Sequence, residues 1–385
     1  MLRLFPLFMA LLASWPALAQ SWKPYHELGD LYPSYAIAVA NLVPDEDKRA
    51  YSLGDPNGFM GITLTTNQPN TKVRLELRSD DALNLFAPVV LEVTAPEAGQ
   101  EYLITPLIPF SPNRLAALRQ ATTTYVTYHV TINDQPQPPR TERLRVRSIN
   151  DCPFAVVGDD DELAIDFMFA AYVNEDHPWI QELLQEALRK KYVDAFVGYQ
   201  AGPSAVYRQV AAIWRVLQER GIRYSSSPAV VPVQKGVASQ PVRLIDDMAQ
   251  YTQANCADGC VLLASVLRRV GLNPTLVVVP GHMFLGFDLD DDGEQQAYLE
   301  TTLLGADTRR TAIQNNALYK TLLNGQATLG AQLAMKSFVA AVEAGNRTFV
   351  NHQDSIENEE TGYALVDIGV ARAAGIVPIS YVAPK

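Results

Sequence analysis

Three residues in the C-terminal part of the chain are of the types that carry out nucleophilic catalysis through a thiol. Cys256 begins a predicted helix, His282 begins a predicted strand, and Glu300 lies near the end of the next strand. A cysteine at a helix N-terminus faces unpaired N–H groups and the positive end of the helix dipole, which favour the thiolate. A histidine can take the thiol proton, and a carboxylate can orient the imidazole. The pattern predicts a Cys-His-Glu triad.

The segments around these residues resemble the transglutaminase-like superfamily. Residues 255–272, NCADGCVLLASVLRRVGL, are similar to its nucleophile helix: an acidic residue stands two positions after Cys256, and Gly271 stands fifteen positions after it. HMFLGF at 282–287 resembles the family's histidine strand, and YLETT at 298–302 its acidic strand. The resemblance covers roughly this stretch and leaves the N-terminal region out.

This resemblance implies a papain-like catalytic domain in which Cys256 attacks a carbonyl, His282 acts as base and Glu300 orients His282. Three positions depart from the family pattern. Glu300 replaces the usual Asp, Met283 replaces a small residue, and Gly259 and Cys260 stand where many members have helix formers. None of these changes removes the nucleophile or the base.

Acyl transfer also needs donors for the negative charge that develops on the carbonyl oxygen. The backbone N–H of Cys256 is one candidate. Gln250 or Gln253 could supply a second, although an exposed helix glutamine is the alternative interpretation of either.

The chain has three cysteines, so at most one disulfide can form and one thiol must stay free. A Cys152–Cys260 bridge would leave Cys256 free, and burial as small apolar side chains is the alternative for the other two. A metal held by Cys256, Cys260 and His282 lacks a fourth ligand and the usual ligand spacing. We therefore expect no metal and no cofactor at this site.

An acidic run allows a second kind of site. Asp288, Asp290 and Asp292 precede Gly293 in the D-x-D-x-D-G order of a calcium loop, but Leu299 occupies the position of the bidentate acid. Asp-Gly is also a turn dipeptide, and a hairpin turn is needed here. We favour the solvated turn over calcium binding.

Periodicity divides the chain into two regions. From 20 to 150, alternating segments and turn-rich stretches predict an all-β domain, an Ig-like sandwich. From 151 to 385, we expect an α+β transglutaminase-like domain. Its predicted helices are 179–190, 205–220, 255–270, 329–344 and 363–374, and its predicted antiparallel strands are 275–279, 282–289 and 297–303.

Residues 1–19 read as a cleavable signal peptide: Arg3, a short apolar run, and Ala17-Leu18-Ala19 as the cleavage site. No later stretch of the sequence is apolar enough to predict a transmembrane helix. We therefore expect a periplasmic or secreted protein that is not membrane-integral. The net charge of −11 argues against nucleic acid as a partner. Counted from the sequence, 18 basic and 28 acidic residues lie in 151–385, so the acidity belongs to that region.

The sequence thus predicts an exported thiol enzyme that hydrolyses a peptide or amide bond in a peptide or protein substrate. The alternatives are a protein-glutamine transglutaminase, in which an amine replaces water, and a non-catalytic binding or adhesion protein of the same fold. In each case the sandwich is a candidate surface for a protein partner. A calcium-dependent structural module is the third alternative.

Overall fold

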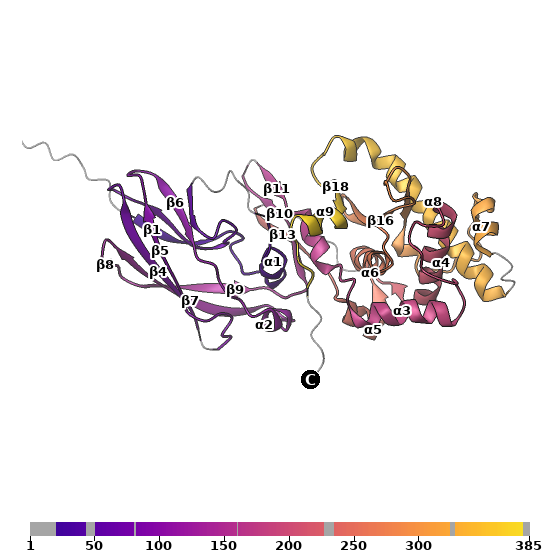
Figure 1. Cartoon of the computed structure of the whole chain (residues 1–385), viewed down its shortest axis with the longest axis horizontal. Coiled ribbons are helices and arrows are strands. Elements are labelled where there is room, and N and C mark those ends of the chain that lie inside the picture. Colours follow the sequence, from indigo (N-terminus) through magenta and orange to yellow (C-terminus); the bar gives the residue numbers. More distant parts are fainter. Residues whose placement is uncertain are drawn as a thin grey trace, which may run out of the picture. The chain divides into compact units, whose positions relative to one another are not determined.

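The computed structural model describes residues 21–43, 51–80, 82–159, 161–226, 235–323 and 328–379, and the predicted signal peptide lies outside them. The fold is a mixed α/β fold with several sheets (Figure 1). The chain forms two compact units. The first comprises the described parts of Met1–Glu27, Pro44–Pro109 and Thr124–Arg143, and the second those of Leu28–Val43, Phe110–Thr123 and Leu144–Lys385. The last segment of the second unit begins close to the boundary predicted near 150, but two earlier segments also belong to this unit.

Two sheets make up the first unit. One has the order β1-β3-β6-β2, with β1 Ser21–His26, β2 Ser52–Gly54, β3 Met60–Thr65 and β6 Glu101–Thr105. The other has the order β5-β4-β7-β8, with β9 also paired to β7. Its strands are β4 Thr71–Ser79, β5 Val89–Ala95, β7 Thr122–Ile132, β8 Gln135–Pro136 and β9 Arg140–Val146.

Alternating side chains of these strands are buried, as in β4, where Val73, Leu75 and Leu77 point into the core. The buried Tyr128 hydroxyl forms a 2.8 Å hydrogen bond with Nε2 of His26, which joins the two sheets. The strand pattern expected for this region is therefore present in the unit.

The prediction that 20–150 contains only strands is wrong at two places. Helices α1 (Pro33–Ala38) and α2 (Pro112–Ala116) each begin with a proline at the first turn, where its missing N–H costs nothing and its fixed φ suits a helix. Every residue of α1 is buried, so its apolar run has no helical alternation. Both helices belong to the second unit.

The second unit is built around the antiparallel sheet β17-β16-β15-β18. Its strands are β15 Pro274–Val279, β16 His282–Asp288, β17 Gln296–Leu299 and β18 Ala364–Asp367. A small sheet, β11-β10-β13, and a parallel pair, β12 with β14, complete it. These strands are β10 Asp151–Val157, β11 Glu162–Ala164, β12 Arg223–Tyr224, β13 Gly236–Pro241 and β14 Gln253–Ala254.

Four of the five helices predicted for this unit are present, and the one predicted over 329–344 extends thirteen residues further, to Glu357. Besides the 3-10 segments η2 (Asp166–Tyr172) and η3 (Thr301–Leu303), the helices of 151–385 are α3 Pro178–Arg189, α4 Pro203–Glu219, α5 Ile245–Tyr251, α6 Cys256–Arg269, α7 Asn316–Leu323, α8 Leu329–Glu357 and α9 Ile368–Ala373. The apolar face of α4, including Val206, Val210 and Trp214, is fully buried. None of the helices in the described ranges is long and apolar enough to cross a membrane.

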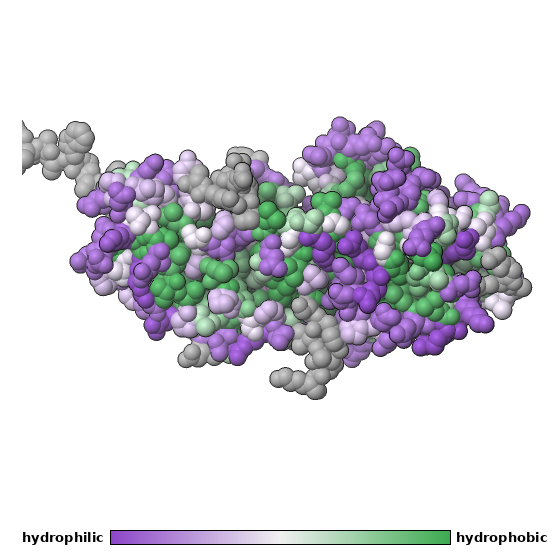
Figure 2. Space-filling view, viewed as in Figure 1, coloured by the Kyte–Doolittle hydropathy of each residue, from purple (hydrophilic) through white to green (hydrophobic). Residues whose placement is uncertain are grey.

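Helix α8 covers the central sheet and continues beyond it. Its Ile356 packs with Val277, Phe284 and Tyr298 of the sheet. Near its middle, Gly345 lies so close to β17 that an added Cβ would stand 2.5 Å from the backbone nitrogen of Leu299, so only glycine fits there. The surface of its C-terminal part and of the turn that follows is mostly hydrophilic (Figure 2).

The prediction of one helix over 363–374 is wrong. Residues 364–367 instead form β18, which pairs with β15 at the edge of the sheet, and α9 follows after Asp367. The Asp367 side chain caps α9 by accepting a hydrogen bond from the backbone N–H of Val370. The cap explains where the helix begins, whereas the strand depends on a partner about ninety residues earlier in the sequence.

Candidate active site

Helix α6 begins at Cys256 because Asn255 and Asp258 cap it reciprocally. The Asn255 side chain accepts a 2.8 Å hydrogen bond from the Asp258 N–H, and the Asp258 carboxylate accepts one of 2.9 Å from the Asn255 N–H. This arrangement is a capping box, which satisfies two otherwise unpaired donors. It places Cys256 in the first turn, where the remaining free N–H groups point out of the helix end.

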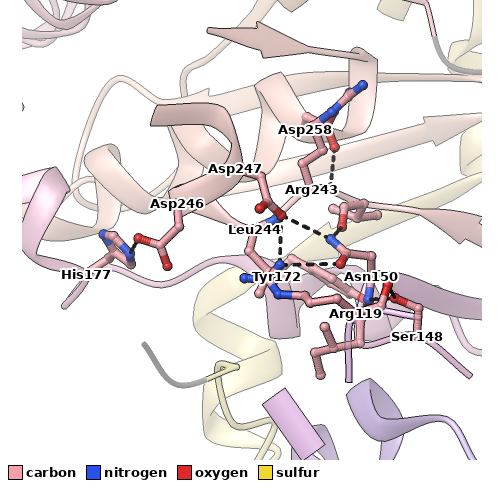
Figure 3. A network of polar contacts seen from close by, with 12 residues as sticks. Arg119, Ser148, Asn150, Tyr172, His177, Arg243, Leu244, Asp246, Asp247 and Asp258 are labelled. Carbon is pink, nitrogen blue, oxygen red and sulfur yellow. Dashed lines mark hydrogen bonds and ion pairs between the residues drawn. The ribbon is translucent and has the colours of Figure 1, made fainter. Parts of the chain in front are cut away.

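The Asp258 carboxylate is completely buried and holds the preceding segment against α6. Arg243 donates to it twice, from its backbone N–H at 2.7 Å and from Nη1 at 2.6 Å (Figure 3). Burial raises the pKa of Asp258 above its ordinary value, although the hydrogen bonds from Asn255 and Arg243 oppose the rise. Asp258 is thus a first-turn helix carboxylate that serves the cap.

A further set of polar contacts supports α5, which lies between Arg243 and Cys256 in the sequence (Figure 3). Asp247 accepts a 2.8 Å ion-pair hydrogen bond from Arg119, and Asn150 donates to the backbone of Val242 at 2.7 Å. Asp246 lies 3.1 Å from Nε2 of the buried His177. These hydrogen bonds hold α5 and the residues just before it, which precede Cys256 in the sequence.

The β15–β16 hairpin places His282. Val279 and His282 are paired across a Pro-Gly turn in which Gly281 has φ +74°, a value that favours glycine. His282 is the first residue of β16, and its Nε2 lies 2.8 Å from Oε2 of Glu300. The ring is thus held from one side by a carboxylate, which leaves Nδ1 to face away from Glu300.

Glu300 follows β17 directly and caps η3, one residue beyond the end of the strand. The predicted strand 297–303 is therefore too long, since β17 ends at Leu299. The Glu300 N–H donates to the Ala341 carbonyl at 3.0 Å, and Oε1 accepts hydrogen bonds from the hydroxyl and N–H of Thr302 at 2.7 and 3.1 Å. Burial raises the pKa of Glu300, but hydrogen bonds from His282 and Thr302 outweigh it, so the pKa is lowered and the carboxylate stays ionised.

His282 also interacts with the thiol of Cys256. A side-chain hydrogen bond with Cys256 and a second with Glu300 together raise the pKa of His282 from 6.5 to about 10, against the opposing effect of burial. The structure thus brings together all three residues that the sequence predicted. The Cys256 thiol is partly exposed, and the side chain of His282 is 30% exposed, so both can be reached from solvent.

Thr301 links α6, which carries Cys256, to the segment that carries Glu300. Its hydroxyl donates to the Cys256 carbonyl at 3.3 Å and lies 3.6 Å from the sulfur of the buried Cys260. A Cβ on Gly259 would stand 3.0 Å from both the Cβ and the hydroxyl of Thr301. Gly259 therefore permits the close approach of α6 to the segment that carries Glu300.

The other sequence-derived candidates do not join this cluster. Gln250 is exposed on α5, and its side chain has no hydrogen bond to Cys256, His282 or Glu300 within the described ranges. All three cysteines are free, so the Cys152–Cys260 disulfide is absent.

Two carboxylates of the acidic run that begins at the end of β16 accept hydrogen bonds from nearby amide groups. Asp288 accepts hydrogen bonds from Asn273 and Gln296, and Asp290 accepts them from Gln295. Asp292 lies in the turn between β16 and β17 and is exposed. In the part of the chain that the structure describes, no group of three or more His, Cys, Asp or Glu residues is arranged to hold a metal ion.

Sequence reasoning missed Arg243, Thr302 and Tyr224. Tyr224 is 44% exposed, and the charges of Cys256 and Glu300 act on it. Thr302 stands two residues after Glu300, so its hydrogen bonds to the Glu300 carboxylate are local in the sequence, and a hydroxyl at this spacing was a signal for them. Arg243 and Tyr224 precede the nucleophile by 13 and 32 residues and share no motif with it, so they had no such signal.

No family model matches the chain, and a search of curated proteins finds no match.

Proposed function

We propose that the protein is a cysteine-dependent acyl-transfer enzyme that hydrolyses peptide or amide bonds. One observation carries the proposal: the His282 ring interacts at once with the Cys256 thiol and, at 2.8 Å, with the ionised Glu300 carboxylate. A partly exposed thiol beside a base that is itself oriented by an acid is the arrangement nucleophilic catalysis requires.

In the proposed reaction, the Cys256 sulfur attacks the carbonyl carbon, and the carbonyl π electrons move to the oxygen. When they return, the C–N bond breaks, and the amine leaves with the proton that His282 had taken from the thiol. Water then attacks the thioester, aided by His282, and releases the acid and the thiol. Glu300 stabilises the imidazolium in both steps.

We further propose that the second unit is a transglutaminase-like domain. The order of α6, β15, β16 and β17 along the chain, with the three residues at the positions that the resemblance implies, supports this assignment. The two-sheet core of the first unit supports an Ig-like sandwich, a candidate surface for a protein partner. An exported, periplasmic or secreted location is part of the same proposal and depends on residues 1–19.

The proposal is tested with p-nitrophenyl acetate, which transfers its acetyl group to a reactive thiol. We expect a burst of p-nitrophenolate and an acetyl group on Cys256, identified by peptide mass spectrometry. Cys256→Ala should abolish both, whereas Cys152→Ala, which alters a buried thiol, should retain them. A burst that survives in Cys256→Ala would contradict the proposal.

A second arm distinguishes water from amine as the acceptor. Fluorogenic peptide amides report hydrolysis, and a labelled primary amine offered with casein reports transamidation. Cleavage that needs Cys256 supports the hydrolase, and Cys256-dependent incorporation of the amine would instead support the transglutaminase. Neither reaction, together with no acetylation, would favour a binding protein.

A further inference from the structure

The second unit contains a cavity of about 410 Å³ that is separate from the candidate active site. Its walls come from the segment between α3 and α4, from α4, and from α7 and α8, which contribute Leu322 and Met335. None of the described residues that line it belongs to α6, to β16 or to the segment that carries Glu300. The volume lies within the range of small-molecule sites.

Two side chains hold the walls of this cavity in place. The buried Gln209 of α4 accepts hydrogen bonds from two backbone N–H groups, at 2.8 and 3.0 Å, and donates one of 2.8 Å to the Gly198 carbonyl. The Tyr192 hydroxyl donates to Glu219 at 2.6 Å, and the guanidinium of Arg215 lies 3.6 Å from the centre of the tyrosine ring. These contacts fix the segment between α3 and α4 against α4, so the cavity exists before any ligand enters it.

Arg208 is the cation of this cavity that has no partner. Arg215 also lines the cavity, but its Nε donates to Glu219 at 3.0 Å. Lys191 and Asp194 are exposed and carry opposite charges, which offset each other. Arg208 is half-buried and forms no hydrogen bond or ion pair with any residue in the ranges that the structure describes. Its guanidinium therefore keeps its donors for a ligand.

The surface of α4 around Arg208 consists of small apolar side chains. Ala205, Ala211 and Ala212 stand three residues before, three after and four after Arg208, positions that neighbour it on a helix. All three alanines are buried and line the cavity, and the residues that α7 and α8 contribute are apolar as well. A guanidinium binds a carboxylate through two parallel hydrogen bonds, and the apolar walls suit an aliphatic chain.

We propose that this cavity binds a small aliphatic carboxylate, whose charged group accepts hydrogen bonds from Arg208 and whose chain contacts the alanines of α4. The region 151–385 has more acidic than basic residues, so its general field does not attract anions. A carboxylate must therefore be held by a local cation. The site is independent of the proposed catalytic function.

The test measures binding of hexanoate to the protein by isothermal titration calorimetry. We expect Arg208→Gln to bind hexanoate at least about 10-fold more weakly than the parent protein, because the hydrogen bonds between charged groups are lost. Hexanamide, which lacks the charge, and inorganic phosphate, which lacks the chain, should both bind more weakly than hexanoate. Arg189→Gln is the matched control, because Arg189 is exposed and does not line the cavity, and it should bind hexanoate as the parent does.

Thermal unfolding gives a second measurement, because a ligand that binds only the folded protein raises the Tm. Hexanoate should raise the Tm of the parent protein and of Arg189→Gln but not that of Arg208→Gln, whose own unfolding transition shows that it is folded. No binding of hexanoate to the parent protein, or equal binding to Arg208→Gln, would overturn the inference. Binding of hexanamide or of phosphate as strong as that of hexanoate would overturn it too, because the site would then not recognise an aliphatic carboxylate.

Discussion

The contact between His282 and Glu300 predicts what happens when the carboxylate loses its charge. Glu300→Gln keeps the size of the side chain and an oxygen that can accept from Nε2 at the observed 2.8 Å. It removes the negative charge that helps to raise the pKa of His282 to about 10. The Cys256 thiol, the first cause of that rise, stays in place. The substitution therefore isolates the electrostatic part played by the acid.

The size of the effect follows from the geometry. Opposite charges about 4 Å apart interact by about 4 kcal/mol at an effective dielectric constant near 20. The side chains of Glu300 and His282 are 11% and 30% exposed, so solvent reduces this value. A loss of about 2 pKa units, or about 2.7 kcal/mol, is the result expected for a pair of this kind. The pKa of His282 should fall to about 8, and acylation that needs the imidazolium should slow between about pH 8 and pH 10, where the parent ring is still protonated.

The pKa of His282 is measured by NMR titration of the histidine ring signals. The sequence has five histidines, and the signal of His282 is identified as the one missing from the spectrum of His282→Ala. Glu294→Gln is the matched control, because Glu294 is exposed in the turn between β16 and β17. A raised histidine pKa stabilises the fold fully below the unfolded value of 6.5, and this stabilisation is lost as the pH rises through about 10. Glu300→Gln should lose it at a lower pH than the parent protein.

A His282 signal that titrates at the same pH in Glu300→Gln and in the parent protein would refute this reasoning. It would mean that the carboxylate has no electrostatic effect on the ring. A lowered pKa without a slower acylation would keep the electrostatics and remove the catalytic role of the acid.

Three other substitutions test the surroundings of the site. Gly259→Ala places a methyl group 3.0 Å from Thr301. We expect the free energy of unfolding, measured with urea, to fall by about 1–3 kcal/mol and the acetylation of Cys256 to slow. An unchanged free energy and an unchanged rate would contradict the close approach. Arg243→Gln removes the ion pair to the buried Asp258. We expect the free energy of unfolding to fall by about 2 kcal/mol at pH 7, and the difference from the parent protein to shrink as acid protonates the carboxylate. Burial raises the pKa of Asp166 to about 6, so the free energy of unfolding falls as the pH rises from about 4 through about 6. Asp166→Asn should therefore be more stable than the parent by about 3 kcal/mol at pH 8 and equally stable at pH 3, and a gain independent of pH would disprove this cause.

Local patterns predicted much of the second unit. The helix predicted over 205–220 is α4, and the strands predicted over 275–279 and 282–289 form the β15–β16 hairpin, because each apolar pattern lies within the element that it forms. The order of Cys256, His282 and Glu300 likewise followed from short motifs. The structure brings these residues together through α6, the hairpin and the end of β17.

The remaining features depend on contacts between distant segments. Residues 364–367 form a strand only because β15 offers an edge, and the sequence there fits a helix as well. Tyr224 comes close to Cys256 through a parallel pairing across about thirty residues, which leaves no mark on spacing. Arg243 reaches Asp258 from fifteen residues earlier in the sequence, where no local motif pairs the two residues.

The most direct test of the central claim, that His282 activates Cys256, is the rate of alkylation of each thiol by iodoacetamide at neutral pH. The three cysteines are free, so peptide mass spectrometry reads all of them in one experiment. We predict that Cys256 reacts well ahead of the buried Cys152 and Cys260 and faster than a cysteine in an unstructured peptide, and that His282→Ala removes this advantage. A Cys256 that reacts no faster than the peptide thiol, or equally fast without His282, would contradict the account.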